Sequence, residues 1–159
     1  MSSSSPYEHV REMKRMNRLD RCRLVLCFSL DDLNDIIWSA AYHGDTDIVR
    51  DMLNCLLEDN RSDDTINTLL SGRTPPRIIP PPSPSREDIE QGRVFTSLIN
   101  SAAHGAIYGE KRETLRYILR YYNPDTVDYL IIYAEHFGRR NMADMIYTWS
   151  LRSYYSRYI

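Results

Sequence analysis

Three stretches of the chain repeat one layout, and this repetition limits the fold more than any other feature. Each begins with bulky apolar residues, reaches an alanine-containing step, passes a His and a Gly, and enters a second segment with helical apolar spacing. The stretches are IIWSAAYHGDTDIVRDML at 36–53, LINSAAHGAIYGEKRETLRYIL at 98–119 and LIIYAEHFGRRNMADMIY at 130–147. Periods of about 20 to 50 residues are typical of stacked repeats. The pattern therefore predicts three helical hairpins side by side.

Four apolar residues at the start of the first stretch and just before it follow the spacing of an amphipathic helix, i, i+3, i+4 and i+7. They are Leu33, Ile36, Ile37 and Ala40. Ser29 stands three residues before Asp32 and is expected to cap this helix. Gly44 is expected to end it in the left-handed conformation. No segment alternates apolar and polar residues over a useful length, so the predicted class is all-α.

The chain divides into five segments by composition. Residues 1–6 are expected to be a Ser-rich tail, and residues 7–28 one basic amphipathic helix. The first hairpin and a short further helix are predicted over 29–70. Residues 71–85 hold six of the eight prolines, which predicts a proline-rich loop because proline lacks a backbone donor and fixes φ. The second and third hairpins are predicted over 86–159.

Helix boundaries in the second half follow from glycine and asparagine. A turn is predicted around Gly105 to Gly109, and the third hairpin is expected to break at Gly138. Asn123 followed by Pro124 predicts a new helix start, because Asn caps well and proline fits the first helical position.

The segment SAAYHGDTDIVRDML at 39–53 resembles the ankyrin repeat. That family combines small residues in an inner helix, a glycine turn, and an outer helix of the form xxIVxxLL. Here the matching residues are Ala40, Ala41, Gly44, Ile48, Val49, Met52 and Leu53. The Thr-Pro-Leu-His start of ankyrin repeats is absent, as is the sequence of their connecting β-hairpin. The resemblance does not extend to the residues before 29 or to 54–93.

This resemblance implies a short ankyrin-like solenoid that acts as a non-enzymatic protein–protein interaction adaptor. Divergent repeats of this kind occur in multigene families of large DNA viruses, which would imply a role in modulating host signalling. The partner surface is expected along the inner helices and turns, where aromatic and His side chains recur. The predicted residues are Tyr42, His43, His104, Tyr108, His136 and Phe137.

Two other function classes are open at this stage. The basic residues of the N-terminal helix would suit nucleic acid or a targeting signal; they are Arg11, Lys14, Arg15, Arg18 and Arg21. The Arg- and Tyr-rich C-terminal helices add a second nucleic-acid candidate, but a net charge of −2 does not favour phosphate binding. The apolar C-terminus YYSRYI suggests instead a structural subunit that forms homo-oligomers.

Cysteine use and hydropathy predict an intracellular, non-membrane protein. The chain has three cysteines, Cys22, Cys27 and Cys55, without metal-binding spacing, and they are expected to be free buried thiols. No apolar run of membrane-spanning length is present.

No catalytic constellation is present, so neither an enzyme nor a cofactor or small-molecule substrate is predicted. His43, His104 and His136 stand near the three turns, which suggests the hypothesis of a shared zinc site. Equivalent positions of packed helices lie about 10 Å apart, far more than a metal–nitrogen bond, so these histidines are expected to support turns instead.

The proline-rich loop contains the pattern P-x-x-P-x-R at Pro81, Pro84 and Arg86. A polyproline helix with a flanking Arg is the ligand of SH3-type domains, but a plain spacer has the same composition.

Overall fold

The computed structural model describes residues 5–60 and 86–158, and every regular element in this part of the chain is helical. The all-α class is confirmed. The elements are α1 (Pro6–Lys14), α2 (Arg18–Val25), α3 (Leu30–Tyr42), α4 (Thr46–Asn60), α6 (Arg86–Tyr108), α7 (Arg112–Leu119), the short 3-10 helix η1 (Pro124–Thr126), α8 (Asp128–His136) and α9 (Arg140–Tyr158). None of the helices in 5–60 and 86–158 is long and apolar enough to cross a membrane.

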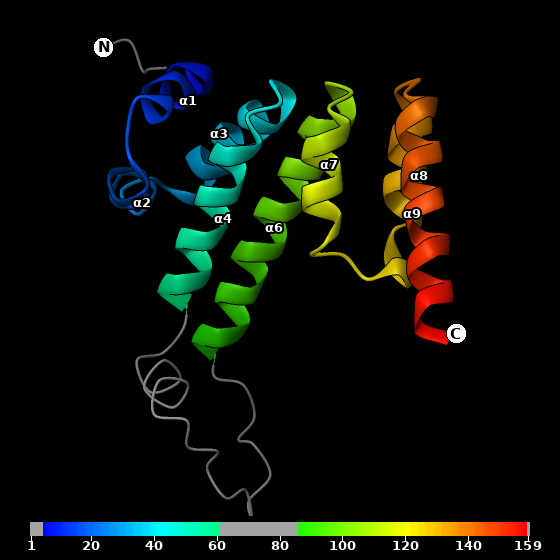
Figure 1. Cartoon of the computed structure of the whole chain (residues 1–159). Helices are drawn as coiled ribbons and strands as arrows, with labels where there is room; N and C mark the ends of the chain where they lie inside the picture. The colour runs from blue at the N-terminus through cyan, green and yellow to red at the C-terminus, as the bar shows by residue number, and fades with distance from the viewer. Residues whose placement is uncertain (1–4, 61–85, 159) are drawn as a thin grey trace, which may run out of the picture.

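The helices form pairs that lie one after another along the molecule (Figure 1). The first helices of the pairs, α1, α3, α6 and α8, each contact the next, and we call them the first-helix row. The second helices, α2, α4, α7 and α9, make a parallel set of contacts and form the second-helix row. One continuous apolar core runs through all the pairs. Every pair therefore buries its apolar faces against its neighbours in the chain.

Three turns with the same hydrogen bonds end α3, α6 and α8. The backbone N–H groups of Asp45, Lys111 and Arg139 donate to the carbonyls of Ala40, Ala106 and Ala134, at 2.9, 2.9 and 2.7 Å. This bond spans a residue with positive φ in each turn, as in the Schellman motif. That residue is Gly44 (φ 77°), Glu110 (φ 56°) or Gly138 (φ 72°). The left-handed conformation predicted for Gly44 is confirmed.

The second turn lies later than predicted. Gly105 is inside α6, which continues to Tyr108, and the chain reverses at Glu110. The three histidines consequently do not occupy matching positions. His43 follows the last residue of α3, His136 is the last residue of α8, and His104 lies one helical turn before the end of α6. The prediction began the turn at Gly105 because a His followed by a Gly also stands at the other two turns. In the structure Gly105 lies inside α6, where it allows close helix packing.

Glycines let α3 and α6 approach each other more closely than side chains would permit. A Cβ atom on Gly105 would meet the carbonyl oxygen of Trp38, and one on Gly109 would meet the carbonyl oxygen of Tyr42. Ala41 lies opposite Gly105, and its small side chain also permits a short distance between the two helices. Close packing of this kind depends on the absence of side-chain atoms at the contact.

The single helix predicted over 7–28 is wrong, because two helices cover this segment. α1 ends at Lys14, and α2 begins at Arg18 after a turn. Asn17 is the N-cap of α2, and its side-chain oxygen accepts a 2.8 Å hydrogen bond from the Asp20 N–H. Asn is among the best N-cap residues, and the chain uses it to start a new helix.

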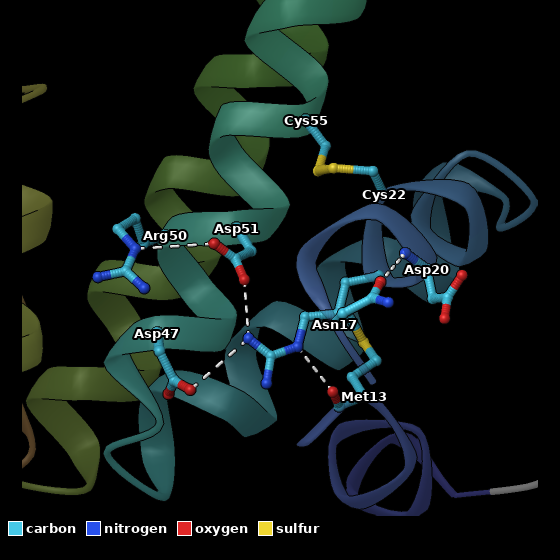
Figure 2. Close-up of polar contacts among 9 residues, drawn as sticks. Met13, Asn17, Asp20, Cys22, Asp47, Arg50, Asp51 and Cys55 are labelled. Atoms are coloured by element: carbon cyan, nitrogen blue, oxygen red, sulfur yellow. Dashed lines mark hydrogen bonds and ion pairs between the residues drawn. A yellow bond between two sulfur atoms is a disulfide. The ribbon is translucent and has the colours of Figure 1, made fainter. Parts of the chain in front are cut away.

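The prediction of free buried thiols is also wrong. Cys22 of α2 and Cys55 of α4 form a disulfide with a Cα–Cα distance of 5.4 Å (Figure 2). Cys27 is free and exposed. The bond joins residues that are 33 positions apart. Cysteine spacing along the chain could not reveal this pair, because the contact arises only when α2 packs on α4.

The remaining boundary predictions have mixed outcomes. Ser29 caps α3, since its hydroxyl accepts a 3.3 Å bond from the Asp32 N–H, as predicted. Asn123 accepts from the Asp125 N–H at 3.0 Å, but it starts only η1, and α8 begins four residues after Pro124. The predicted short helix at 63–70 and the whole proline-rich loop at 71–85 lie outside the described residues.

Candidate functional site

Aromatic and His side chains of the first-helix row form one chain of ring contacts, which we call the aromatic strip. It includes one residue from α1, three from α3 and its turn, two from α6, and four from α8 and its turn. Its members are Tyr7, Trp38, Tyr42, His43, His104, Tyr108, Tyr129, Tyr133, His136 and Phe137. A strip that crosses four helices is an extended surface and not a closed pocket.

Helical spacing places these rings on the same side of each first helix. Residues four apart are neighbours on a helix surface. The spacing recurs in α3, α6 and α8 as Trp38 and Tyr42, His104 and Tyr108, and Tyr129, Tyr133 and Phe137. Because α3 and α6 also approach closely, rings from adjacent helices come within contact distance.

The first part of the strip joins α3 to α6. The rings of Trp38 and Tyr42 are stacked, with centroids 5.1 Å apart and an interplanar angle of 9°. Both rings lie 6.0 Å from the Tyr108 ring of α6. On the other side, His43 contacts Tyr7 of α1 at 4.0 Å. These contacts extend the strip to the N-terminal end of the row.

The second part of the strip joins α6 to α8. His104 stacks on Tyr133 with centroids 4.1 Å apart and an angle of 10°. Tyr133 contacts Phe137 at 4.7 Å, and Phe137 lies edge-on to Tyr108 at 5.6 Å. Offset and edge-to-face geometries of this kind add to the energy of simple burial. The rings are thus held in place before any ligand arrives.

The strip is only half covered by the protein's own atoms. Tyr108, Phe137 and Tyr129 remain 37%, 40% and 41% exposed, which leaves a large part of each ring available to a partner. Ile132, between Tyr129 and Phe137 on α8, is 65% exposed. Clusters of exposed apolar groups on a protein surface are typical of binding sites.

Arg139 adds a cation beside the strip. Its guanidinium carbon lies 5.0 Å from the centroid of the Tyr108 ring, and its Nε donates a 3.0 Å hydrogen bond to the Tyr108 carbonyl. Since this side chain leads from the turn after α8 to the end of α6, it also ties two turns together. The strip therefore offers rings with one positive charge at its edge.

The structure brings the six residues predicted as a binding surface into this one network. Tyr42, His43, Tyr108 and Phe137 are linked ring to ring, His136 contacts Phe137 at 4.9 Å, and His104 joins through Tyr133. The prediction missed four members: Tyr7, Trp38, Tyr129 and Tyr133. Aromatic residues four apart on each first helix were the signal that would have found the last three.

The predicted basic patch is not one surface. It divides between α1 and α2, and two of its cations are engaged by carboxylates of α4 and its preceding turn. Lys14 Nζ lies 2.7 Å from Asp45 Oδ1, and this contact raises the pKa of Lys14. Arg21 donates to Asp51 Oδ2 at 2.7 Å and to the Met13 carbonyl at 2.7 Å (Figure 2). Arg11 and Arg15 are exposed. Two of the five cations, Lys14 and Arg21, therefore hold this segment against α4 and the turn before it.

Two further features that the sequence suggested, a shared zinc site and the proline motif, do not contribute to the strip as described. Among residues 5–60 and 86–158, no group of His, Cys, Asp and Glu has a geometry suited to a metal ion. Pro81 and Pro84 of the proline motif lie outside the described residues, and of Arg86 only the backbone at the start of α6 is described.

His104 is expected to make the stability of the folded protein depend on pH. Burial lowers the pKa of His104 below its ordinary value of 6.5, and its Nε2 has no partner among the described residues. The folded protein thus binds fewer protons here than the unfolded chain, so stability is expected to fall as pH drops below about 6.5, by no more than about 1.4 kcal/mol per pH unit.

Replacement of His104 by phenylalanine, which keeps a ring against Tyr133, is expected to remove this part of the pH dependence. Urea unfolding of both proteins between about pH 7.5 and about pH 5 measures it. Parallel curves of stability against pH would contradict the assignment.

Comparison with known proteins adds no relative: no family model, curated protein or solved structure matches this chain. The geometry of the aromatic strip is therefore the observation that bears on its role.

Proposed function

We propose that this chain is a non-enzymatic adaptor, an ankyrin-like row of helical pairs whose aromatic strip binds a protein partner. One observation supports this function above all: ten aromatic and His rings form a continuous, half-exposed surface across four helices. Repeat proteins bind partners through such extended surfaces. Aromatic residues are also the commonest residues to dominate the energy of a protein interface.

The rigidity of the strip favours binding. Tyr108 contacts rings from α3 and α8, and the Arg139 guanidinium lies over it. A side chain that is already held loses little conformational entropy when a partner covers it. The partner expected for such a surface presents apolar or aromatic side chains along an extended segment or a helix.

Replacement of Phe137 or Tyr108 by alanine is expected to weaken partner binding by about 2 kcal/mol each, the size typical of an interface hot spot. Affinity purification from the native host, followed by mass spectrometry, identifies the partner. Titration calorimetry with the purified partner then measures the loss. Tyr147→Ala is the matched control, because Tyr147 is 56% exposed on α9 and outside the strip.

If Phe137→Ala and Tyr147→Ala retained every partner of the unaltered chain at equal affinity, the strip would not be the binding surface. Circular dichroism of each variant ensures that a lost partner does not reflect a lost fold.

Self-assembly is the second candidate, and a different surface favours it. At the C-terminal end of the row, α9 exposes Tyr147 (56%) and Leu151 (38%), which are four residues apart. No further helical pair of the described chain covers this end. Light scattering distinguishes the two functions: Tyr147→Ala would reduce a concentration-dependent oligomer, whereas a monomer at all concentrations supports the adaptor.

A further inference from the structure

A second site lies on the second-helix row, away from the aromatic strip. A pocket of about 670 Å³ is formed between α7 and α9, a volume within the range of ligand sites. Its lining residues are Arg112, Arg116, Asn141, Asp144, Met145, Thr148, Trp149 and Arg152.

One wall of this pocket is positively charged. Arg112 and Arg116 are four residues apart on α7 and share a face, while Arg152 comes from α9. The guanidinium groups of these three residues make no ion pair or hydrogen bond with another described residue. Asp144 is the single carboxylate among the lining residues, so the cations are in excess.

These arginines differ from several cations of the described chain whose charged groups already have a partner. Lys14 and Arg21 are held by carboxylates, and Arg120, also on the α7 side, lies 4.2 Å over the Tyr117 ring. A guanidinium without a carboxylate partner retains its forked donors for an incoming phosphate or carboxylate.

The other wall of the pocket is apolar. Met145 and Trp149 are four residues apart on α9, half-buried, and both line the pocket. A thioether and an indole ring provide contacts for a flat hydrocarbon group. A ligand that uses both walls therefore carries a strongly anionic group on an aromatic ring.

We propose that this pocket binds a phosphotyrosine side chain of a partner protein, with the phosphate on the three arginines and the ring against Trp149 and Met145. A phosphate dianion matches several guanidinium groups better than a single carboxylate does. Phosphoserine would fill only the charged wall. A nucleic-acid strand needs phosphate contacts along its length. A single pocket on a chain with a net charge of −2 therefore does not favour nucleic acid as the ligand.

The test uses fluorescence polarisation with the full chain and four labelled probes. They are a degenerate peptide with a central phosphotyrosine, the same peptide with phosphoserine, the same peptide with tyrosine, and a single-stranded DNA oligonucleotide. The phosphotyrosine probe is expected to bind at least about tenfold more tightly than each of the others, because only it engages both walls. Equal binding of phosphoserine or tyrosine, or tighter binding of DNA, would overturn the proposal.

Variants connect this binding to the pocket. Arg116→Ala is expected to weaken phosphotyrosine binding about tenfold, and Asp144→Asn to strengthen it by removing the one repulsive carboxylate. Arg120→Ala removes the same charge from the C-cap of α7, outside the pocket, and it is expected to leave phosphotyrosine binding unchanged. If Arg120→Ala matched Arg116→Ala, or Asp144→Asn brought no gain, general charge and not this pocket would account for binding.

Phe137→Ala separates this proposal from the proposed function. It alters the aromatic strip and leaves the pocket intact, so phosphotyrosine binding should remain while partner binding through the strip falls. Loss of phosphotyrosine binding in Phe137→Ala would contradict a separate site.

Discussion

Replacement of Arg21 by methionine is expected to lower the free energy of unfolding by about 3–5 kcal/mol, because it leaves a buried carboxylate without its partner. The Asp51 side chain is only 6% exposed, and the Arg21 guanidinium bonds to it at 2.7 Å. Without Arg21, the nearest cation is Arg50, whose Nε lies 3.7 Å away, too far for a hydrogen bond. Chemical denaturation at neutral pH measures the change.

Two further variants show that the cost comes from the unpaired charge. In the double variant Arg21→Met with Asp51→Leu, apolar side chains replace both ions, and most of the stability is expected to return. Arg11→Met removes an exposed cation of α1 and is expected to change stability by less than about 0.5 kcal/mol. If the double variant were as unstable as the single one, the hydrogen bond from Arg21 to the Met13 carbonyl would be the more important contact.

Replacement of Gly105 by alanine is expected to cost about 3 kcal/mol, the upper part of the range for overpacking, because the new Cβ meets backbone. The carbonyl oxygen of Trp38 lies within clashing distance of that Cβ position, and the Ala41 Cβ is 3.2 Å from it. A flexible side chain could move aside, but the backbone of α3 moves only if the two helices separate.

Gly92→Ala is the matched control within the same helix. A Cβ on Gly92 has no atom within 4 Å, so its substitution is expected to stabilise α6 by up to about 1 kcal/mol through higher helix propensity. Thermal unfolding of the two variants should therefore give shifts of opposite sign. Shifts of the same sign and size would contradict the close approach of α3 and α6.

Separation of α3 from α6 would also disrupt ring contacts in the aromatic strip. The contacts of Trp38 and Tyr42 with Tyr108 cross this interface, and they depend on the two helices staying close. Near-UV circular dichroism of Gly105→Ala is expected to show weaker aromatic signals than that of Gly92→Ala. The packing of two glycines and the order of the proposed binding surface are thus physically linked.

The predictions that the structure confirms at helix ends depend only on neighbouring residues. The cap at Ser29 and the left-handed Gly44 each require only atoms within a few positions of the chain, and both are confirmed. The helical class follows in the same way from apolar residues spaced three and four apart. Local chemistry also explains the error at α1 and α2, since Asn17 is a strong N-cap within a segment whose spacing otherwise suits one helix.

The candidate sites depend on residues that are distant in sequence. Tyr133 meets His104, and Arg152 joins Arg116 in one pocket, only after the helical pairs have packed. Each ring or guanidinium was visible in the printed sequence, but its partners were not. The i, i+4 spacing on the first helices predicts that rings share a face, and it does not say which face meets which neighbour.

The sequence by itself determined the helical class and the helix ends at Ser29, Gly44 and Gly138, because caps, left-handed glycines and apolar spacing act over a single helical turn. Only the tertiary structure decided that Glu110 and not Gly105 forms the second turn, that Cys22 bonds to Cys55, and that Arg21 lies against Asp51. These features depend on how closely whole helices approach each other, and that distance is set by the packing of the complete core.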